Sequence, residues 1–451
     1  MSNNIKDIIE QSGIKFGTSG ARGLVVDFTS EVCTAFTQSF LDAMKKSFDF
    51  KRVAVAMDNR PSSSEIVAAI CANIEAYGFE VDFYGVLPTP ALALQAMRDK
   101  IPSLMITGSH IPFDRNGIKF YTPDGEISKE DEKDILNNTN SMIDTHSFSL
   151  EVNNKAAQNY LNRYSNYFGK NCLNNLKIGI YEHSSAGRDL YADLFKSLGA
   201  QVTCLGRSDE FVPIDTEAVA DVDKKRAKDW SKEYGFDAIF STDGDGDRPL
   251  IADENGDWLR GDIVGLLTSY ILGIEALAVP VSCNTAIEKS GFFKEVRRTK
   301  IGSPYVIEAF KELETYKSFA GFEANGGFLL GSTLKQDENI LDALPTRDAL
   351  LPFIVLLSQV IKEEVLLSKL VQDLPQRFTS SDRIQEFPRE NSMKLLEKAA
   401  SNPNELLKTL GLEDLKVVDI NQIDGLRLTL DNSSVIHLRP SGNAPELRCY
   451  V

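Results

Sequence analysis

The feature that most constrains the fold is a strand–helix–strand unit that recurs three times along the chain. Each copy has a short apolar run, then a longer segment of helical character, then a second short strand. The copies cover residues 52–57, 62–77 and 79–84; residues 176–181, 186–198 and 201–205; and residues 278–282, 287–296 and 297–299. Such units pack as helical layers on a sheet, so the sequence predicts an α/β fold.

The residues from 372 onward follow a different pattern. A strand at 382–387 and a helix at 392–401 precede a run of short strands at 416–420, 425–430 and 434–439. This order predicts a small α+β domain after a helical linker over residues 348–371. We therefore expect four domains, with the ranges 1–150, 151–255, 256–371 and 372–451.

Composition narrows the class of protein and its partners. The 451 residues are 42% hydrophobic and 25% charged, as in soluble globular proteins, and no apolar run is long enough for a membrane span. The first residues lack the apolar core of a signal peptide, and the six cysteines have no paired spacing, so we expect a cytoplasmic protein with reduced thiols. A net charge of −16 argues against nucleic acid or an anionic membrane as partner. Local clusters of Arg, Lys and backbone N–H groups must then capture any anionic ligand.

Two short segments carry the strongest chemical signal. Thr107–Pro112 places the Ser109 hydroxyl in a tight turn beside His110, and Asp243–Arg248 places three carboxylates at alternate positions before an arginine. Alternate side chains of an extended segment point the same way, so the three carboxylates can converge on one hard cation. A serine that carries a phosphate needs such a cation beside it. Together the segments predict phosphoryl transfer through a phosphoserine.

Each segment also has a simpler interpretation. The serine turn can be only a turn, and the acidic triplet only a solvated loop. An EF-hand calcium loop that begins at Asp243 would have its final ligand at Glu254, which fits, but it needs glycine where Arg248 stands. The flanking residues 236–241 and 249–252 also read as strands instead of the helix pair of an EF-hand.

Four further groups of residues could bind phosphate or sugar. Arg22 lies in the glycine-rich segment 15–23, where backbone N–H groups can approach an anion. Lys119 follows the serine turn closely enough to act on a hydroxyl proton or to pair with phosphate. Glu323 and Asn325 lie in a glycine loop and can accept hydrogen bonds from sugar hydroxyls. The last group suits a phosphate dianion and consists of Arg439, Ser441 and Asn443 in a turn between strands. Each of these segments is also compatible with an ordinary loop.

In this order the segments resemble the α-D-phosphohexomutase family across essentially the full chain. Members of that family have a serine loop, an Asp-Gly-Asp-Gly-Asp-Arg metal loop, a sugar loop and a C-terminal phosphate loop on four successive domains. The metal loop here is identical to the family pattern, whereas the other loops depart from it at Gly108, Ile111, Asn325, Asn443 and Ala444.

The resemblance implies a fold, an activity and a set of site residues. The fold would be three similar α/β domains with mixed sheets and a C-terminal α+β domain like the TATA-binding-protein fold, around a central cleft. Phosphorylated Ser109 would donate to a hexose phosphate, and the hexose 1,6-bisphosphate intermediate would turn around and return its other phosphate, with Mg²⁺ as cofactor. The resemblance assigns metal binding to Ser109, Asp243, Asp245 and Asp247; catalysis to Ser109, His110, Lys119, Arg22 and Arg248; and substrate binding to Glu323, Asn325, Arg439, Ser441, Gly442, Asn443 and Arg448.

The sugar is the least constrained part of this interpretation. The form of the last loop is most similar to the phosphomannomutase branch of the family, which favours mannose 6-phosphate and mannose 1-phosphate. Glucose, glucosamine and N-acetylglucosamine phosphates stay open as alternatives, as does a monomer or a homodimer. A catalytically silent relative is disfavoured because Ser109 and all three aspartates are present. Hydrolysis through an aspartyl-phosphate is disfavoured because Asp247 stands where that chemistry wants another residue.

Overall fold

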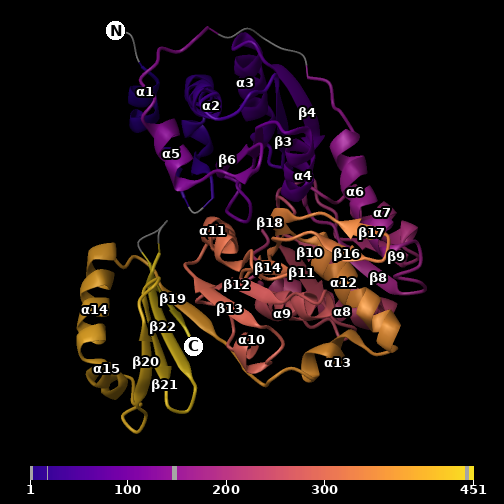
Figure 1. Ribbon diagram of the computed structural model, residues 1–451, viewed down its shortest axis with the longest axis vertical. Helices are drawn as coiled ribbons and strands as arrows, with labels where there is room; N and C mark the ends of the chain where they lie inside the picture. The colour runs from indigo at the N-terminus through magenta and orange to yellow at the C-terminus, as the bar shows by residue number, and fades with distance from the viewer. Residues whose placement is uncertain (1–3, 18, 145–149, 442–445) are drawn as a thin grey trace.

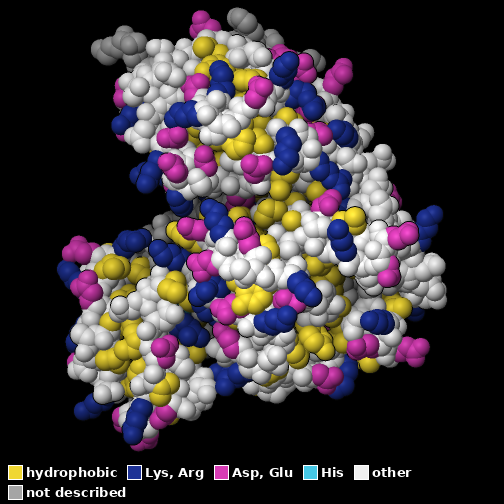
Figure 2. Space-filling view, viewed as in Figure 1, with side chains coloured by type: hydrophobic (Ala, Val, Ile, Leu, Met, Phe, Trp, Pro, Cys, Tyr) yellow, Lys and Arg dark blue, Asp and Glu magenta, His cyan; other side chains and the backbone are white. Residues whose placement is uncertain are grey.

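The structure is a computed structural model that describes residues 4–17, 19–144, 150–441 and 446–451. Three α/β units follow one another along the chain, and antiparallel strands with two helices form a fourth (Figure 1). This architecture confirms the predicted fold class. The four main sheets use residues 15–126, 177–252, 276–348 and 381–450; the domain boundaries between them stay a prediction. Figure 2 shows a hollow between the first and the C-terminal unit, with Lys and Arg side chains on its rim.

The first unit is a seven-stranded mixed sheet between helices. The order along it is β1 (Lys15–Phe16), β2 (Ala21–Leu24), β6 (Arg115–Thr122), β5 (Ser103–Ile106), β3 (Arg52–Met57) and β4 (Glu80–Val86), with β7 (Gly125–Glu126) beside β6. Its helices are α1 (Ile5–Gln11), α2 (Ser30–Met44), α3 (Ser63–Ala76), α4 (Thr89–Asp99) and α5 (Lys129–Leu136). Strand β3 runs parallel to both β4 and β5, so the segments after β3 and β5 meet at one sheet edge.

The second and third units repeat this plan with smaller sheets. The second has the order β11 (Pro249–Ala252), β10 (Ala238–Thr242), β8 (Lys177–Tyr181) and β9 (Gln201–Leu205), with helices α6 (Lys155–Phe168), α7 (Tyr191–Ser197) and α8 (Asp221–Tyr234). The third has the order β13 (Glu295–Thr299), β12 (Ala276–Pro280), β14 (Phe319–Phe322), β15 (Phe328–Leu330) and β18 (Leu344–Asp348), with helices α9 (Gly261–Ile271), α10 (Ala286–Lys289) and α11 (Ser303–Leu313). A two-stranded sheet, β16 (Leu334–Gln336) with β17 (Asn339–Leu341), projects from it.

The three predicted strand–helix–strand units are present, and in each the two strands are parallel neighbours. The helix predicted over residues 287–296 is wrong in length, because α10 is a single turn. Gly291 follows it with a φ of +67°, a left-handed conformation that ends a helix. Part of the predicted helix instead belongs to β13.

The segment predicted as a linker is part of the core. Helix α12 (Leu350–Glu363) carries fully buried residues around its whole circumference for most of its length, and a helix that is apolar all round is buried. The Phe353 ring lies 4.6 Å from the ring of Phe240 and 5.0 Å from that of Phe195, so α12 of the third unit closes the core of the second. The chain then passes through α13 (Leu367–Gln372) and the residues after it into the last unit.

The C-terminal unit is a five-stranded antiparallel sheet covered on one face by two helices. The strand order is β19 (Ser381–Ile384), β23 (Leu447–Tyr450), β22 (Val435–Pro440), β21 (Leu426–Leu430) and β20 (Val417–Asn421), and the helices are α14 (Arg389–Ser401) and α15 (Pro403–Thr409). This confirms the predicted α+β character. Among the described helices, none has the length and apolar character needed to span a membrane.

Candidate active site

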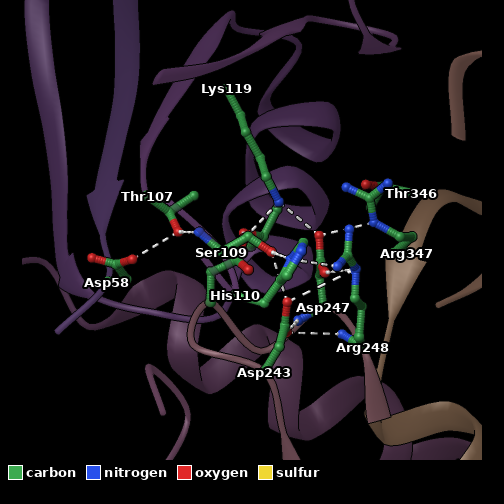
Figure 3. Close-up of polar contacts among 12 residues, drawn as sticks. Asp58, Thr107, Ser109, His110, Lys119, Asp243, Asp247, Arg248, Thr346 and Arg347 are labelled. Carbon is green, nitrogen blue, oxygen red and sulfur yellow. Dashed lines mark hydrogen bonds and ion pairs between the residues drawn. The ribbon is translucent and has the colours of Figure 1, made fainter. Parts of the chain in front are cut away.

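Ser109 lies in the turn that follows β5, at the carboxyl edge of the first sheet. Its φ is +54°, which is uncommon for a residue with a side chain, and the turn is fixed by a 2.7 Å hydrogen bond from the Ser109 N–H to Thr107 Oγ1. The buried Ser109 hydroxyl donates to Asp243 Oδ2 at 2.8 Å, as Figure 3 shows. The serine loop and the acidic loop therefore meet at the serine oxygen.

Arg60, immediately after β3, holds the serine loop in place. Its buried guanidinium donates to Asp58 and also to four carbonyl oxygens of the loop, at 2.6–3.0 Å: those of Ser109, Ile111, Pro112 and Arg115. Asp58 in turn accepts from Thr107 Oγ1 at 2.7 Å (Figure 3). The Arg60 guanidinium also lies 3.9 Å from the centre of the Phe211 ring, so a residue of the second unit covers this clamp.

The acidic loop is the hairpin turn between β10 and β11. Asp243, Asp245 and Asp247 are fully buried, and one carboxylate oxygen from each lies within 4.8 Å of the others. Asp243 Oδ1 accepts the backbone N–H groups of Asp247 and Arg248, both at 3.2 Å, which folds the loop around its first carboxylate. Because strands flank this loop, the EF-hand alternative is wrong.

Close approach of the two loops depends on Gly244. A Cβ atom at this position would lie 2.7 Å from the carbonyl oxygen of Ser109. Any side chain here would therefore push the acidic loop away from the serine. The glycines between the aspartates thus bring Asp243 within hydrogen-bonding distance of Ser109.

The aspartate cluster has the donor set of a metal site. Lys119 Nζ donates to the Oδ2 atoms of Asp245 and Asp247 at 2.5 and 2.7 Å, and Thr89 Oγ1 donates to the same oxygen of Asp245. The Oδ1 atoms of Asp245 and Asp247 are buried and have no hydrogen-bond partner among the described residues. Buried carboxylate oxygens without partners are strongly disfavoured, and a hard cation would satisfy both. These residues therefore fit a divalent metal ion.

Burial and neighbouring charges shift the pKa values of the three carboxyl groups in different directions. Burial, reinforced by the two neighbouring aspartates, raises the pKa of Asp243 well above its ordinary value. Burial acts in the same direction on Asp245, but the Lys119 ammonium outweighs it and lowers the pKa of that carboxyl. The pKa of Asp247 is also lowered, because Arg347 outweighs the effect of burial. Asp243, the residue on the serine, is therefore the carboxyl that most requires added positive charge to ionise.

His110 lies beside the Ser109 hydroxyl, but its closer hydrogen bond is to Arg248. Its Nδ1 is 3.4 Å from Ser109 Oγ and accepts from Arg248 Nη1 at 2.7 Å. Burial and the Arg248 charge lower the pKa of His110 to about 3, so the imidazole is neutral near pH 7. A neutral imidazole can accept a proton, and Arg248 fixes the tautomer that carries hydrogen on Nε2.

The two other cations predicted for the site come from the first unit. Lys119 on β6 lies between two aspartates, and the described contacts place its ammonium on them and not on Ser109. Arg22 on β2 pairs in register with Gly117 of β6. Burial and the nearby Arg248 charge lower the pKa of Arg22 to about 10, although Asp245 and Asp247 act on it in the opposite direction.

The sugar loop predicted from the sequence connects β14 and β15. Glu323 is buried, and its carboxylate accepts from Arg347 at 3.2 Å. Asn325 Oδ1 accepts the N–H of Gly327 at 3.0 Å, and the Asn325 carbonyl accepts from Thr216 Oγ1 of the second unit. These two contacts fix the Asn325 side chain and backbone within the sugar loop.

The predicted phosphate loop stands apart from these groups. Arg439, at the end of β22, donates to Asp424 at 2.9 Å, and Arg448 on β23 contacts Glu446 at 3.3 Å. The Ser441 N–H donates to the Glu446 carbonyl at 2.8 Å. The two other predicted residues, Gly442 and Asn443, lie outside the described residues. No contact among the described residues joins this loop to Ser109 or to the aspartates.

Sequence reasoning missed three side chains that shape the centre: Asp58, Arg60 and Arg347. The first two follow β3 directly, and because β3 and β5 are parallel neighbours, residues after β3 must lie near residues after β5. The parallel pairing of β3 and β5 could therefore have predicted that Asp58 and Arg60 lie near the serine loop. Arg347 had no comparable signal, since nothing in its sequence surroundings indicates that a charged residue at the end of β18 is buried against Asp247.

Comparisons with known proteins agree with this geometry. Residues 13–145 match the family model described as phosphoglucomutase/phosphomannomutase, alpha/beta/alpha domain I, and residues 261–378 match domain III of the same family. A phosphomannomutase from Salmonella muenchen is 56% identical over 449 residues, which covers 99% of this chain and 94% of that protein.

Solved structures show the same fold at low identity. A phosphoglucomutase/phosphomannomutase family protein from Burkholderia thailandensis superposes with a TM-score of 0.74 at 20% identity, covering 96% of this chain and 92% of the other. An N-acetylphosphoglucosamine mutase from Aspergillus fumigatus, solved in complex with glucose 1,6-bisphosphate, has a TM-score of 0.58 at 14% identity and covers 100% and 95%.

Proposed function

The chain belongs to the α-D-phosphohexomutase family, in its phosphoglucomutase/phosphomannomutase branch, and we propose that it interconverts mannose 6-phosphate and mannose 1-phosphate. The reaction passes through a phosphoserine at position 109 and mannose 1,6-bisphosphate. The observation that carries this proposal is the 2.8 Å contact between Ser109 Oγ and Asp243, which joins a nucleophile to a buried triad of carboxylates. The mannose assignment draws on the Salmonella relative.

Mg²⁺ is the cation that we assign to the aspartate triad. Three carboxylates, two of whose oxygens lack a hydrogen-bond partner in the described part of the chain, lie next to the Ser109 oxygen that would carry a phosphate. Together they make an all-oxygen donor set for a hard ion. When bound, the ion offsets negative charge on the transferring group. Ser109, Asp243, Asp245 and Asp247 would hold it.

In the forward half-reaction, a sugar hydroxyl oxygen attacks the phosphorus on Ser109 and the bond to Ser109 Oγ breaks. The hydroxyl proton needs an acceptor, and we propose His110 and Lys119, the nearest candidates beside the serine and the aspartates, as the general acid and base. Arg248, fixed on His110, and Arg22 place positive charge where the phosphoryl group passes. In the second half-reaction, the turned bisphosphate returns its other phosphate to Ser109 and the proton movements reverse.

The two remaining loops hold the sugar during both half-reactions. Glu323 and Asn325 contact sugar hydroxyls, and the loop with Arg439, Ser441, Gly442, Asn443 and Arg448 binds the phosphate that is not reacting. A bisphosphate that must bind in two orientations favours contacts common to both. Discrimination between mannose and glucose, which differ only at the 2-hydroxyl, is therefore modest, about 1–3 kcal/mol for a single-group difference.

Four substrates tested side by side decide the assignment. The 1-phosphates of mannose, glucose, glucosamine and N-acetylglucosamine are assayed with the matching 1,6-bisphosphate as activator, and kcat/KM is compared. We expect mannose first and glucose within about tenfold. A preference for another sugar above tenfold would move the assignment within the family, whereas turnover of none would contradict a mutase.

The phosphorylation state, oligomeric state and cellular location of the protein follow from the same function. We expect Ser109 to carry phosphate in part of the purified protein, which intact mass and peptide mapping can detect. We further propose a cytoplasmic monomer or homodimer that takes phosphorylated hexoses and neither nucleic acid nor membrane as partner. The net charge of −16 supports the last point, because phosphate backbones and anionic lipids repel such a surface.

A further inference from the structure

Arg347 is a fully buried arginine placed between the acidic loop and the sugar loop. It lies on β18, and its guanidinium comes from the third unit toward Asp247, as Figure 3 shows. Its Nε donates to Asp247 Oδ2 at 3.0 Å, and its Nη1 donates to Glu323 Oε2 at 3.2 Å. One side chain therefore joins a carboxylate of the predicted metal site to the predicted sugar-binding carboxylate.

Further hydrogen bonds fix the orientation of the Arg347 guanidinium. Nη1 also donates to Ser303 Oγ at 2.8 Å, and the Ser303 hydroxyl donates onward to Glu126 of the first unit at 2.8 Å. Thr346 Oγ1 donates to the second oxygen of the same glutamate at 3.1 Å. Residues from all three α/β units thus hold the group, and it has little freedom to turn away.

One edge of the guanidinium is left without a partner. Nη2 of Arg347 is buried and makes no hydrogen bond in the part of the chain that the structure describes. A buried donor without an acceptor is unfavourable, particularly on a charged group, so this edge of the guanidinium calls for an explanation. Asp247 Oδ2 and Glu323 Oε2 already accept from Nε and Nη1, and the remaining Oδ1 of Asp247 is assigned to the metal ion, which leaves Nη2 for an acceptor on a ligand.

The sugar loop makes room for this arginine. A Cβ atom on Gly327 would lie 2.5 Å from Cδ and 2.6 Å from Cγ of Arg347, so the Arg347 stem occupies the space that a side chain at 327 would need. The backbone at Gly327 is itself fixed by the Asn325 side chain. The wall of the sugar loop is therefore formed in part by a residue from a different strand.

From these contacts we propose that Arg347 is a substrate-binding residue, whose Nη2 donates to an oxygen of the bound hexose phosphate at its reacting end. The inference rests on the proposed function and deepens it. A hexose phosphate supplies both an acceptor and negative charge. A ligand that is held by Glu323 and points its reacting end toward the aspartates spans the two loops that Arg347 connects. Arg347 then fixes the separation between sugar and metal loop and contacts the ligand directly.

The test measures binding without turnover. In a Ser109→Ala background, calorimetry with Mg²⁺ present gives the Kd of mannose 1-phosphate and of glucose 1-phosphate. Adding Arg347→Met should weaken binding by about 10- to 100-fold, the range for one charge-assisted hydrogen bond. Arg347→Lys, which keeps the charge but loses the fork of donors, should weaken binding to an intermediate extent.

A matched control separates contact from stability. Arg163 on α6 is another buried arginine, and two of its nitrogens have no hydrogen-bond partner among the residues that the structure describes. Its third nitrogen donates to the Asp342 carbonyl. Arg163→Met should lower the melting temperature and leave both Kd values unchanged. If Arg347→Met loses only thermal stability and binds sugar phosphates as the background does, the inference is overturned. The same holds if its weaker binding is restored by excess Mg²⁺, because the effect would then run through Asp247.

Two further outcomes keep the result clear. If Arg347→Met does not fold, Arg347→Lys decides: binding equal to the background contradicts direct contact. If the background itself binds none of the hexose phosphates while remaining folded, the proposed function fails before Arg347 is tested. Added ethylguanidinium should restore part of the binding in Arg347→Ala, and rescue of that kind is expected only for a group that reaches the ligand.

Discussion

The catalytic centre and the C-terminal unit differ sharply in how their functional residues are held. Around Ser109, the loops of three units meet through buried hydrogen bonds and ion pairs: Arg60 clamps the serine loop, Asp243 contacts it, and Arg347 connects the acidic and sugar loops. In the C-terminal unit, Arg439 and Arg448 pair with acidic residues of the same unit. Among the described residues, contacts from that unit to the third unit include Asp424 with the Ile301 N–H and Arg377 with Thr285 Oγ1.

This difference separates two tasks of one reaction. Phosphoryl transfer needs groups fixed before the ligand arrives, because reorganisation would raise the barrier. Binding a phosphate at the distal end of a ligand that reverses its orientation needs a grip that can adapt. We therefore expect substitutions around Ser109 to act on the chemical step and substitutions in the C-terminal loop to act on binding.

The largest effect should come from the nucleophile. Ser109→Ala removes the oxygen that carries the phosphate, so kcat should fall on the order of 10⁴-fold or more. Steady-state mutase assays measure this, and Ser269→Ala, a buried helical serine of the third unit, is the matched control. Activity within tenfold of the parent would contradict a phosphoserine mechanism.

The metal loop should come next. Asp245→Asn nearly keeps the shape of the side chain but removes one charge, so we expect kcat to fall by about 10²- to 10³-fold and the Mg²⁺ requirement to rise. Rates are measured across a Mg²⁺ titration. Asp253→Asn, in the turn that directly follows β11, is the matched control. Full turnover of the parent enzyme in excess EDTA would remove the metal from the account.

Arg60 tests whether the serine loop is preorganised. Arg60→Met removes four hydrogen bonds to the loop carbonyls, and displacement of Ser109 by about 1 Å should lower kcat by roughly 10²-fold with a smaller change in KM. If KM alone rises, the loop is held by other contacts. A crystal structure of the variant would show whether Ser109 leaves Asp243.

The C-terminal grip should give a smaller effect of a different kind. Arg439→Ala should raise KM by about 10- to 100-fold, while phosphorylation of Ser109 by a small acyl phosphate continues at the parental rate. Arg389→Ala, an exposed arginine at the start of α14, serves as control. Loss of the small-donor reaction in a folded Arg439→Ala protein would place this residue in the chemical step and break the comparison.

The smallest effect concerns acid stability of the second unit. Burial lowers the pKa of His183 to about 4, against 6.5 when unfolded. Between these values only the unfolded chain binds the proton, so stability is lost as pH falls from about 6.5 toward 4, by roughly 2 kcal/mol at pH 5. His183→Asn removes the titrating imidazole and tolerates the φ of +31°. Melting temperatures from pH 7 to 5 should therefore fall less in the variant than in the parent.

Much of the fold and of the catalytic centre could be predicted from the sequence, because the residues that carry the chemistry lie in local patterns. The alternation of Asp243, Asp245 and Asp247 and the turn at Ser109 are short-range features, as are the strand–helix–strand units. Arg60 and Arg347 contact the serine and acidic loops at separations of 49 and 100 residues along the chain. The core role of α12 was missed for the same reason, since an apolar helix does not show in its own sequence which unit it covers.

The central claim is that phosphate passes between Ser109 and the sugar, and a single-turnover experiment tests it directly. Protein phosphorylated at Ser109 is mixed with mannose 1-phosphate, and the phosphate on Ser109 and the sugar products are followed over time. We predict that phosphate leaves Ser109 at least as fast as kcat and appears in mannose 1,6-bisphosphate. Phosphate that stays on Ser109 during turnover, or that appears as inorganic phosphate, would contradict the account.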